Sequence, residues 1–254
     1  MANQTDTLPM SAEPNPAARP WGFWATLGWT LLAFTVGLLV AGVVVTGLVR
    51  WDTSLSDYQF LFRNGNPIGS SVMLLSYGVL ITVLVFAARC SGSSAAEYLG
   101  FVRPRGRYVL AGLLCVVFPL LLTFAHAMQF DASQFLNAHG FDRARAANGL
   151  IIHVMAVVVI GPVMEEIVFR GFLYRGLSAT RIGIAGTVVI TAVAWALMHP
   201  GKGPAGIFDT AIHGIAWGWL RWYTGSIWVP IASHVANNGF SVLLILLGLY
   251  GWFG

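Results

Sequence analysis

The stretch of sequence that decides the fold is residues 149–177, GLIIHVMAVVVIGPVMEEIVFRGFLYRGL. It is apolar over most of its length, and it exceeds the ~20 apolar residues that an α-helix needs to cross a bilayer. Glu165, Glu166 and Arg170 interrupt it. Ionisable side chains inside a bilayer cost about 2.5–3.5 kcal/mol each on insertion scales, so their presence points to a functional site. The stretch therefore predicts a transmembrane helix that contributes residues to a functional site.

The rest of the chain has the same character. Only 9% of its 254 residues are charged, 57% are hydrophobic, and the mean hydropathy is +0.73. A soluble surface needs about 25–35% charged residues, so the composition excludes a soluble enzyme, a disordered protein and a nucleic-acid-binding protein. The charges stand between long uncharged runs, which cover residues 20–49, 64–88, 108–130, 146–164, 182–201, 210–220 and 222–254. We predict an all-α, polytopic transmembrane helical bundle.

The number of helices depends on the last run, which is long enough for one long helix or two short ones. Gly225, Pro230 and Gly239 favour two, with a break near Asn238. We therefore expect about eight helices, with seven as the fallback.

Three regions follow from this pattern. Residues 1–20 are polar and rich in Pro, Ala and Ser, and are predicted to be a disordered tail. Residues 21–145 are expected to form the N-terminal transmembrane helices, and residues 146–254 a catalytic transmembrane core. Arginines are more frequent in the segments that lie inside if the N-terminus is cytoplasmic, so the positive-inside rule favours that orientation.

The two adjacent glutamates face different directions on an ideal helix. At 100° per residue, Arg170 lies about 40° from Glu166 but about 140° from Glu165. Glu166 and Arg170 can therefore form an ion pair, while Glu165 has no cation on its own helix. A carboxylate without a cation in an apolar site is a candidate general base.

Other polar residues on apolar segments can complete a site. His199 follows Trp195 by four residues, and Asn238 follows His234 by four, so each pair shares a helical face. If a hairpin turns near Thr180, Glu165 lies ~22 Å and His199 ~28 Å from the turn, within one helical turn of each other in depth. These groups could activate a water or hold a metal, and the amide of Asn238 could donate to an oxyanion.

Asp209 and His213 are also four residues apart on an apolar stretch. They are expected to pair with each other, and an accessory role at the site is the alternative. Motifs of other hydrolases are absent from the sequence, namely H-E-x-x-H and G-x-S-x-G.

In order along the chain, Glu165-Glu166-x-x-x-Arg170, Trp195-x-x-x-His199 and His234-x-x-x-Asn238 resemble the three motifs of the CPBP family (CAAX proteases and bacteriocin-processing proteins, also called Abi). The family pattern is E-E-x-x-x-R, F-x-x-x-H and H-x-x-x-N/B, so Trp195 stands where phenylalanine is commoner. The resemblance extends over about residues 146–248.

The resemblance implies an intramembrane endopeptidase that hydrolyses a peptide bond of a membrane-associated peptide or protein. Whether the substrate has a lipidated or C-terminal tail is left open at this point. Glu165 and His199 are then expected to activate the attacking water, and His234 and Asn238 to stabilise the oxyanion. Supporting roles fall to Glu166, Arg170 and Trp195.

The cofactor and the location are further expectations. We favour a metal-free reaction, although Glu165, His199 and His234 form a sufficient ligand set for one divalent metal such as zinc. The arginine-dominated basic set fits an integral protein of a bacterial plasma membrane.

Two other classes of function stay open. A non-catalytic membrane scaffold or immunity protein could keep the motif residues as a packing network. A proton-coupled transporter could use the acids as relay groups, but the sequence shows no internal repeat of the kind found in many transporters.

Overall fold

The computed structural model describes residues 19–51, 66–104, 117, 120, 121, 124, 125 and 138–247. Counting Leu150–Ser178 as one continuous helix, the described residues form eight α-helices and no strand. This confirms the predicted all-α helical bundle. Most of the tail at residues 1–20 and of the run at 108–130 falls outside the described residues, so the expectations for these segments have no structural counterpart here.

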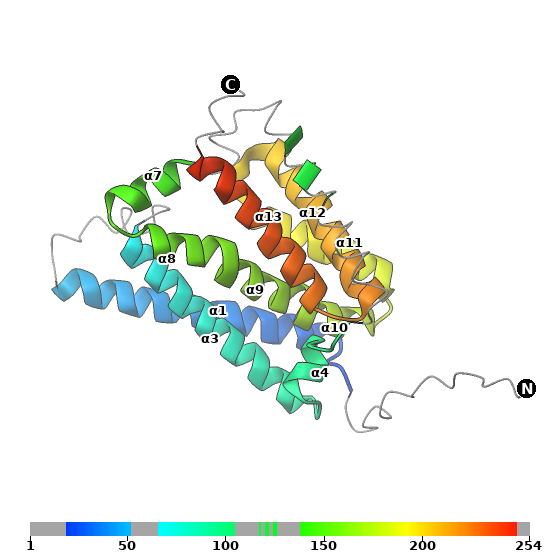
Figure 1. Cartoon of the computed structure of the whole chain (residues 1–254). Helices are drawn as coiled ribbons and strands as arrows, with labels where there is room; N and C mark the ends of the chain where they lie inside the picture. Colours follow the sequence, from blue (N-terminus) through cyan, green and yellow to red (C-terminus); the bar gives the residue numbers. More distant parts are fainter. Residues whose placement is uncertain are drawn as a thin grey trace, which may run out of the picture.

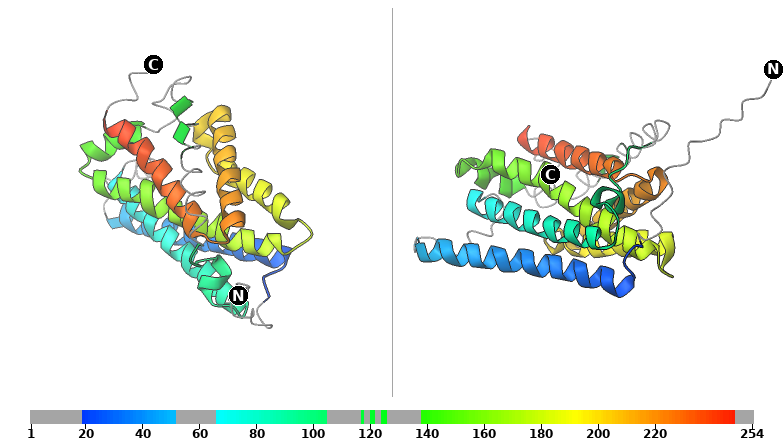
Figure 2. Two further views of the ribbon diagram at one scale, coloured as in Figure 1. Left: turned by 45° about the vertical axis from the view of Figure 1, so that its right-hand side comes forward. Right: turned by 90° about the horizontal axis from the view of Figure 1, so that it is seen from below.

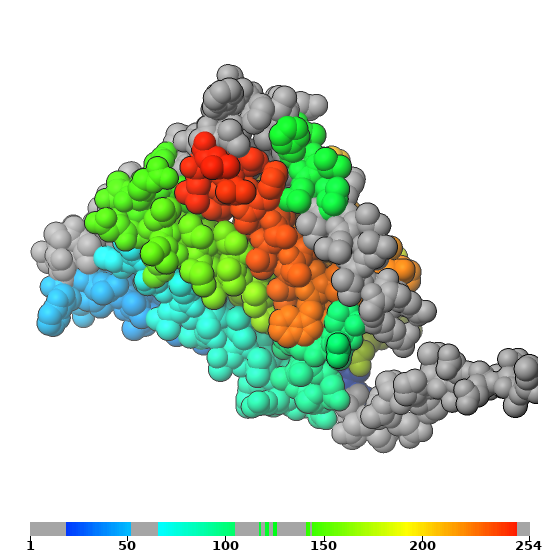
Figure 3. All heavy atoms as spheres, in the orientation of Figure 1, coloured from blue at the N-terminus to red at the C-terminus, as the bar shows by residue number. Residues whose placement is uncertain are grey.

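Four helices are long and apolar enough to cross a membrane. They are α1 (Phe23–Trp51), α3 (Pro67–Cys90), the helix Leu150–Ser178, and α13 (Trp228–Leu246). In Figure 1 they follow one another across the molecule, and the same order is visible from below in Figure 2. Figure 3 shows α3, the helix Leu150–Ser178 and α13 side by side on one face.

A fifth span is possible where two helices meet at an angle. α11 (Gly183–Leu197) and α12 (Gly203–Thr224) are separated by the 3-10 turn η5 (Pro200–Lys202), and the chain bends by 75° there. The pair is either one broken span or a re-entrant loop. Two short helices, α4 (Ala95–Leu99) and α7 (Ala138–Ala146), complete the described part of the chain.

The helix Leu150–Ser178 is the centre of the bundle. It consists of α8 (Leu150–Val154), η3 (Met155–Ile160), α9 (Gly161–Glu166), η4 (Ile167–Leu173) and α10 (Tyr174–Ser178), where η3 and η4 are π-helical. Its segments contact α1, α3, α4, α11, α12 and α13. Every residue of η4 is buried. π-helical segments within α-helices occur frequently at functional sites.

The distribution of apolar side chains is that of a membrane protein. The main core packs around η4 and includes Val168, Phe172 and Trp217. At the periphery, large apolar side chains of α1 are exposed, as expected where lipid rather than water covers a helix.

Two sequence predictions about helix ends can be compared directly with the structure. The hairpin expected near Thr180 is present, because α10 ends at Ser178 and α11 begins at Gly183. The break expected near Asn238 is wrong, since α13 runs without interruption through Gly239. A glycine costs a helix only about 1 kcal/mol, and Pro230 lies in the first turn of α13, where proline is tolerated.

Candidate active site

Glu166 and Arg170 form the buried ion pair that their spacing predicted. Arg170 Nη1 lies 3.0 Å from Glu166 Oε1, and both side chains are fully buried. Arg170 Nη2 also donates to the backbone carbonyl of Gly214 in α12, at 2.9 Å. The guanidinium lies 5.1 Å from the ring centre of Trp195 and 5.6 Å from that of Trp217. The pair therefore fixes the central helix to α11 and α12.

Glu165 lies in a different environment from its neighbour. Its side chain keeps 18% of its surface accessible and lines a cavity. Trp195 Nε1 donates to Glu165 Oε2 at 2.7 Å. No arginine or lysine of the described residues lies within 4.0 Å of this carboxylate. The structure thus places the two glutamates as the helix geometry predicted, with the free carboxylate in the cavity.

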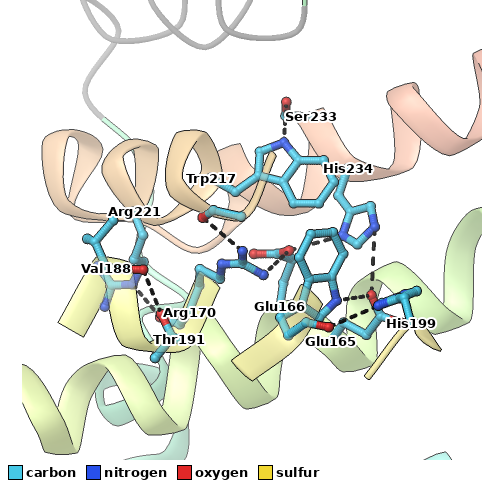
Figure 4. A network of polar contacts seen from close by, with 12 residues as sticks. Glu165, Glu166, Arg170, Val188, Thr191, His199, Trp217, Arg221, Ser233 and His234 are labelled. Atoms are coloured by element: carbon cyan, nitrogen blue, oxygen red, sulfur yellow. Dashed lines mark hydrogen bonds and ion pairs between the residues drawn. The ribbon is translucent and has the colours of Figure 1, made fainter. Parts of the chain in front are cut away.

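His234 lies between the two glutamates, as Figure 4 shows. Its Nδ1 is 3.0 Å from Glu166 Oε1, and its Nε2 is 3.8 Å from Glu165 Oε2. The ring stacks on Trp217 with centroids 3.8 Å apart, and Trp217 Nε1 donates to Ser233 Oγ at 3.0 Å. Since Glu166 accepts from Arg170 and faces His234, these contacts hold the imidazole in one orientation.

His199 has a defined hydrogen-bonding direction at the end of α11. Its Nδ1 lies 2.9 Å from the backbone carbonyl of Trp195. A carbonyl oxygen only accepts, so Nδ1 carries the hydrogen of this bond. In the neutral ring the other nitrogen, Nε2, is then an unprotonated acceptor. His199 is partly buried and lines the same cavity as Glu165.

Asn238 is held by the π-helical segment η3. Its Nδ2 donates to the backbone carbonyl of Val157 at 2.8 Å. An amide nitrogen carries two hydrogens, so this bond leaves one for another acceptor. Asn238 also lines the cavity.

A single cavity of about 560 Å³ brings together Glu165, His199, His234 and Asn238, the four residues expected to be catalytic. This volume is within the usual range for small-molecule sites. Asp209 and His213 line it too, and they pair as expected, with Asp209 Oδ2 3.4 Å from His213 Nδ1.

The comparisons with known proteins match this part of the chain. Residues 147–240 match the sequence model of the family described as Type II CAAX prenyl endopeptidase Rce1-like. A Bacillus subtilis protein described as "Putative membrane peptidase YdiL" is 33% identical over 89 residues, which are 35% of this chain and 35% of that protein. The match thus spans about a third of the length of this curated relative. No solved structure matches the chain.

Both matches support CPBP family membership for this region of the chain. The matched region contains all three motifs that suggested the family, from Glu165 in the central helix to Asn238 in α13. The apolar helices of the described residues and the similarity to a membrane peptidase together support an integral membrane protein.

A metal site was the other expectation for the side chains of the cavity. Among the described residues, no group of three or more His, Cys, Asp or Glu side chains is arranged to hold a metal ion. The possible ligand set of Glu165, His199 and His234 shares the cavity, and the Nδ1 atoms of His199 and His234 are directed to Trp195 and Glu166, which leaves both Nε2 atoms for a water or a metal.

Sequence reasoning missed several residues of the site, among them Trp217, Gly214 and Lys202. Trp217 follows His213 by four residues, so its position on the cavity side of α12 could have been read from the spacing. The carbonyl of Gly214 is a backbone group and leaves no mark in the sequence. Lys202 is the chain's single lysine, and its basic side chain in an apolar region was the available signal.

Proposed function

We propose that this chain is an intramembrane endopeptidase that hydrolyses a peptide bond of a membrane-associated peptide or protein. The observation that carries the proposal is a cavity shared by Glu165, the acceptor nitrogen of His199, and two further polar groups, His234 and Asn238. No arginine or lysine of the described residues lies within 4.0 Å of the Glu165 carboxylate. The CPBP assignment supports the same reaction class.

The first step is the activation of water. Glu165 and His199 Nε2 are acceptors, and a water between them can transfer a proton to one of these groups as its oxygen bonds to the scissile carbonyl carbon. Trp195 keeps the carboxylate in place by donating to Oε2. A positioned general base of this kind contributes about 10²–10⁴-fold to a rate.

The second step is the stabilisation of the negative charge that develops on the carbonyl oxygen. Asn238 has an amide hydrogen beyond the one given to Val157, and His234 donates from Nε2 when that nitrogen is protonated. Removal of one such donor typically costs an enzyme about 10²–10³ in kcat. The proton taken from water then passes to the leaving nitrogen as the C–N bond breaks.

Glu166 and Arg170 act through other residues. They orient His234 and fix the central helix against α12, and neither lines the cavity. Glu166 and Arg170 are therefore proposed as positioning residues. Asp209 and His213 lie farther along the cavity wall and are proposed as accessory residues.

The substrate, cofactor and location are parts of the same proposal. We assign a peptide substrate with a lipidated or C-terminal tail, because the matched family is described as a CAAX prenyl endopeptidase. The reaction uses water activated by side chains, without a metal. The protein resides in a bacterial plasma membrane with its N-terminus in the cytoplasm, which the arginine distribution favours.

The test is peptide cleavage by the purified full chain in lipid nanodiscs. A farnesylated C-a-a-X peptide and a pool of unmodified peptides are incubated with the protein, and the products are identified by mass spectrometry. We expect cleavage by the wild type and its loss in Glu165→Ala and His199→Ala, both with unchanged thermal unfolding. Full activity in both variants would refute the assignment. Unchanged biological function together with lowered stability would instead favour a non-catalytic scaffold.

The metal-free reaction is tested on the same material. We expect cleavage to persist after dialysis against a strong chelator, and metal analysis of the active protein to find far less than one equivalent. Loss of activity that returns on adding zinc would contradict this part of the proposal.

A further inference from the structure

The single lysine of the chain, Lys202, lies in the wall of the cavity that contains Glu165 and His199. The other residues counted as basic in the net charge are all arginines. A lone ammonium group in the cavity is not needed for the proposed hydrolysis, so its position calls for a separate explanation.

Lys202 is fixed relative to His199 by the 3-10 turn η5. The backbone N–H of Lys202 donates to the carbonyl of His199 at 3.1 Å. Gly203 follows with a φ of +66°, a conformation that favours glycine, and begins α12. A 3-10 turn rises about 2 Å per residue, so His199 and Lys202 are ~6 Å apart along its axis. The ammonium and the imidazole thus belong to one short turn.

The ammonium has few partners of its own. Nζ donates to Thr210 Oγ1 at 3.2 Å, and an ammonium has three hydrogens to donate. In the part of the chain that the structure describes, no carboxylate lies within 4.0 Å of it. Asp209 and Glu165 attract it from farther away, and its side chain is partly buried. A cation that faces the cavity with only a hydroxyl to bond is free to bind an anionic ligand there.

We propose that Lys202 binds the C-terminal carboxylate of the peptide substrate. The inference rests on the proposed peptidase function and adds to it the side chain that recognises the end of the substrate. An extended peptide covers ~3.5 Å per residue, so a cation on the same turn as His199 meets a carboxylate only close to the scissile bond. A cavity of about 560 Å³ holds a ligand of drug size, which matches the end of a peptide better than a chain passing through.

The first experiment compares two peptide pools of identical sequences, one with free C-terminal carboxylates and one with C-terminal amides. Wild type, Lys202→Met and Lys202→Arg are assayed in nanodiscs, and kcat/KM and the cleavage sites are measured. We expect the wild type to prefer the acids about tenfold or more, the range of a hydrogen bond to a charged group. The ratio of kcat/KM for the acids to that for the amides should fall to near one in Lys202→Met and stay largely unchanged in Lys202→Arg. A merely structural role for Lys202 would slow both pools equally.

Equal rates for the two pools with the wild type would overturn the inference while leaving the peptidase function intact. An undiminished preference in Lys202→Met would do the same. A preference for those amidated peptides that contain an internal Asp or Glu would mean that Lys202 recognises an acidic side chain. The terminal-carboxylate assignment would then be wrong.

The second experiment does not depend on cleavage. Lys202 and the N-terminal amine are the primary amines of the chain, so an amine-acylating reagent reports on Lys202 with an internal reference. With the Glu165→Gln variant, we expect the acid pool to slow acylation of Lys202 but not of the N-terminus, and the amide pool to have no effect. Acylation of Lys202 at the same rate with both pools would overturn the inference, even if no peptide were cleaved.

Discussion

At the residue scale, the two adjacent glutamates lie in different surroundings, and the proposed division of their roles rests on this difference. Glu166 is fully buried and bound by Arg170, whereas Glu165 is partly accessible and accepts from an indole N–H. A buried carboxylate that is already bonded to a guanidinium is a poor proton acceptor, since protonation would leave the cation unpaired. The accessible carboxylate is the one that can exchange protons with a water in the cavity.

Trp195 provides a test of how Glu165 is held. Trp195→Phe keeps an aromatic ring beside His199 but removes the donor that lies 2.7 Å from Glu165 Oε2. A hydrogen bond to a charged group is worth about 1.5–3 kcal/mol, and we expect kcat/KM for peptide cleavage to fall by about tenfold with little change in KM. An unchanged kcat/KM would mean that the indole does not orient the carboxylate.

Much of the site at this scale could be predicted from the sequence. The i, i+4 spacing predicted the Glu166–Arg170 and Asp209–His213 pairs, because neighbours on one helical face depend only on helix geometry. Contacts between helices could not be predicted in the same way. The stacking of Trp217 on His234 depends on how α12 and α13 pack, and a single sequence does not specify that packing.

At the element scale, the close approach of α11 and α12 positions Arg170. Gly214 allows this approach, since a Cβ there would lie 2.9 Å from the Cα and Cβ of Ala192 and 3.2 Å from Arg170 Nη2. The absence of a side chain also lets the carbonyl of Gly214 accept from Arg170.

Gly214→Ala should therefore destabilise the protein. We expect a loss of about 1–3 kcal/mol, the usual cost of overpacking a well-packed contact, together with reduced cleavage because Arg170 is displaced. The matched control is Gly42→Ala in α1, where a Cβ would meet nothing within 4 Å and helix propensity predicts a neutral or slightly stabilising effect. Thermal unfolding in detergent measures both, and equal unfolding temperatures for the two variants would argue against the close-packing explanation.

The elements also show where sequence patterns are unreliable. The hairpin that was assumed near Thr180, to compare the depths of Glu165 and His199, is present between α10 and α11. The break predicted near Asn238 is absent, because the glycine that follows, Gly239, only weakly disfavours a helix that is held by packing. The π-helical segments η3 and η4 had no sequence signal that we recognised.

At the scale of the whole molecule, the fold is a bundle around the helix Leu150–Ser178, with apolar faces outward and the cavity inside. The low fraction of charged residues predicted the transmembrane helical bundle. The domain boundary near residue 146 stays a prediction, although the family match begins at residue 147.

The orientation can be tested with the exposed cysteine at the end of α3, Cys90. In a Cys115→Ala background, an N-terminus in the cytoplasm places Cys90 inside. We expect a membrane-impermeant maleimide to label it only after the cells are permeabilised. The matched control is Ala147→Cys in a cysteine-free background, an exposed position between α7 and the central helix that should be labelled in intact cells. The reverse pattern would show the opposite orientation.

The division of the two glutamates is the central claim, and a comparison of Glu165→Gln with Glu166→Gln tests it most directly. For both variants, the cleavage rate and the unfolding temperature are measured on the same preparation. We predict that Glu165→Gln lowers the rate by at least about a hundredfold with little loss of stability, because only the general base is removed. Glu166→Gln should instead cost about 3–5 kcal/mol of stability, because it leaves Arg170 buried without a counter-charge. Wild-type cleavage by Glu165→Gln, or equal effects of the two variants on rate and stability, would contradict the account.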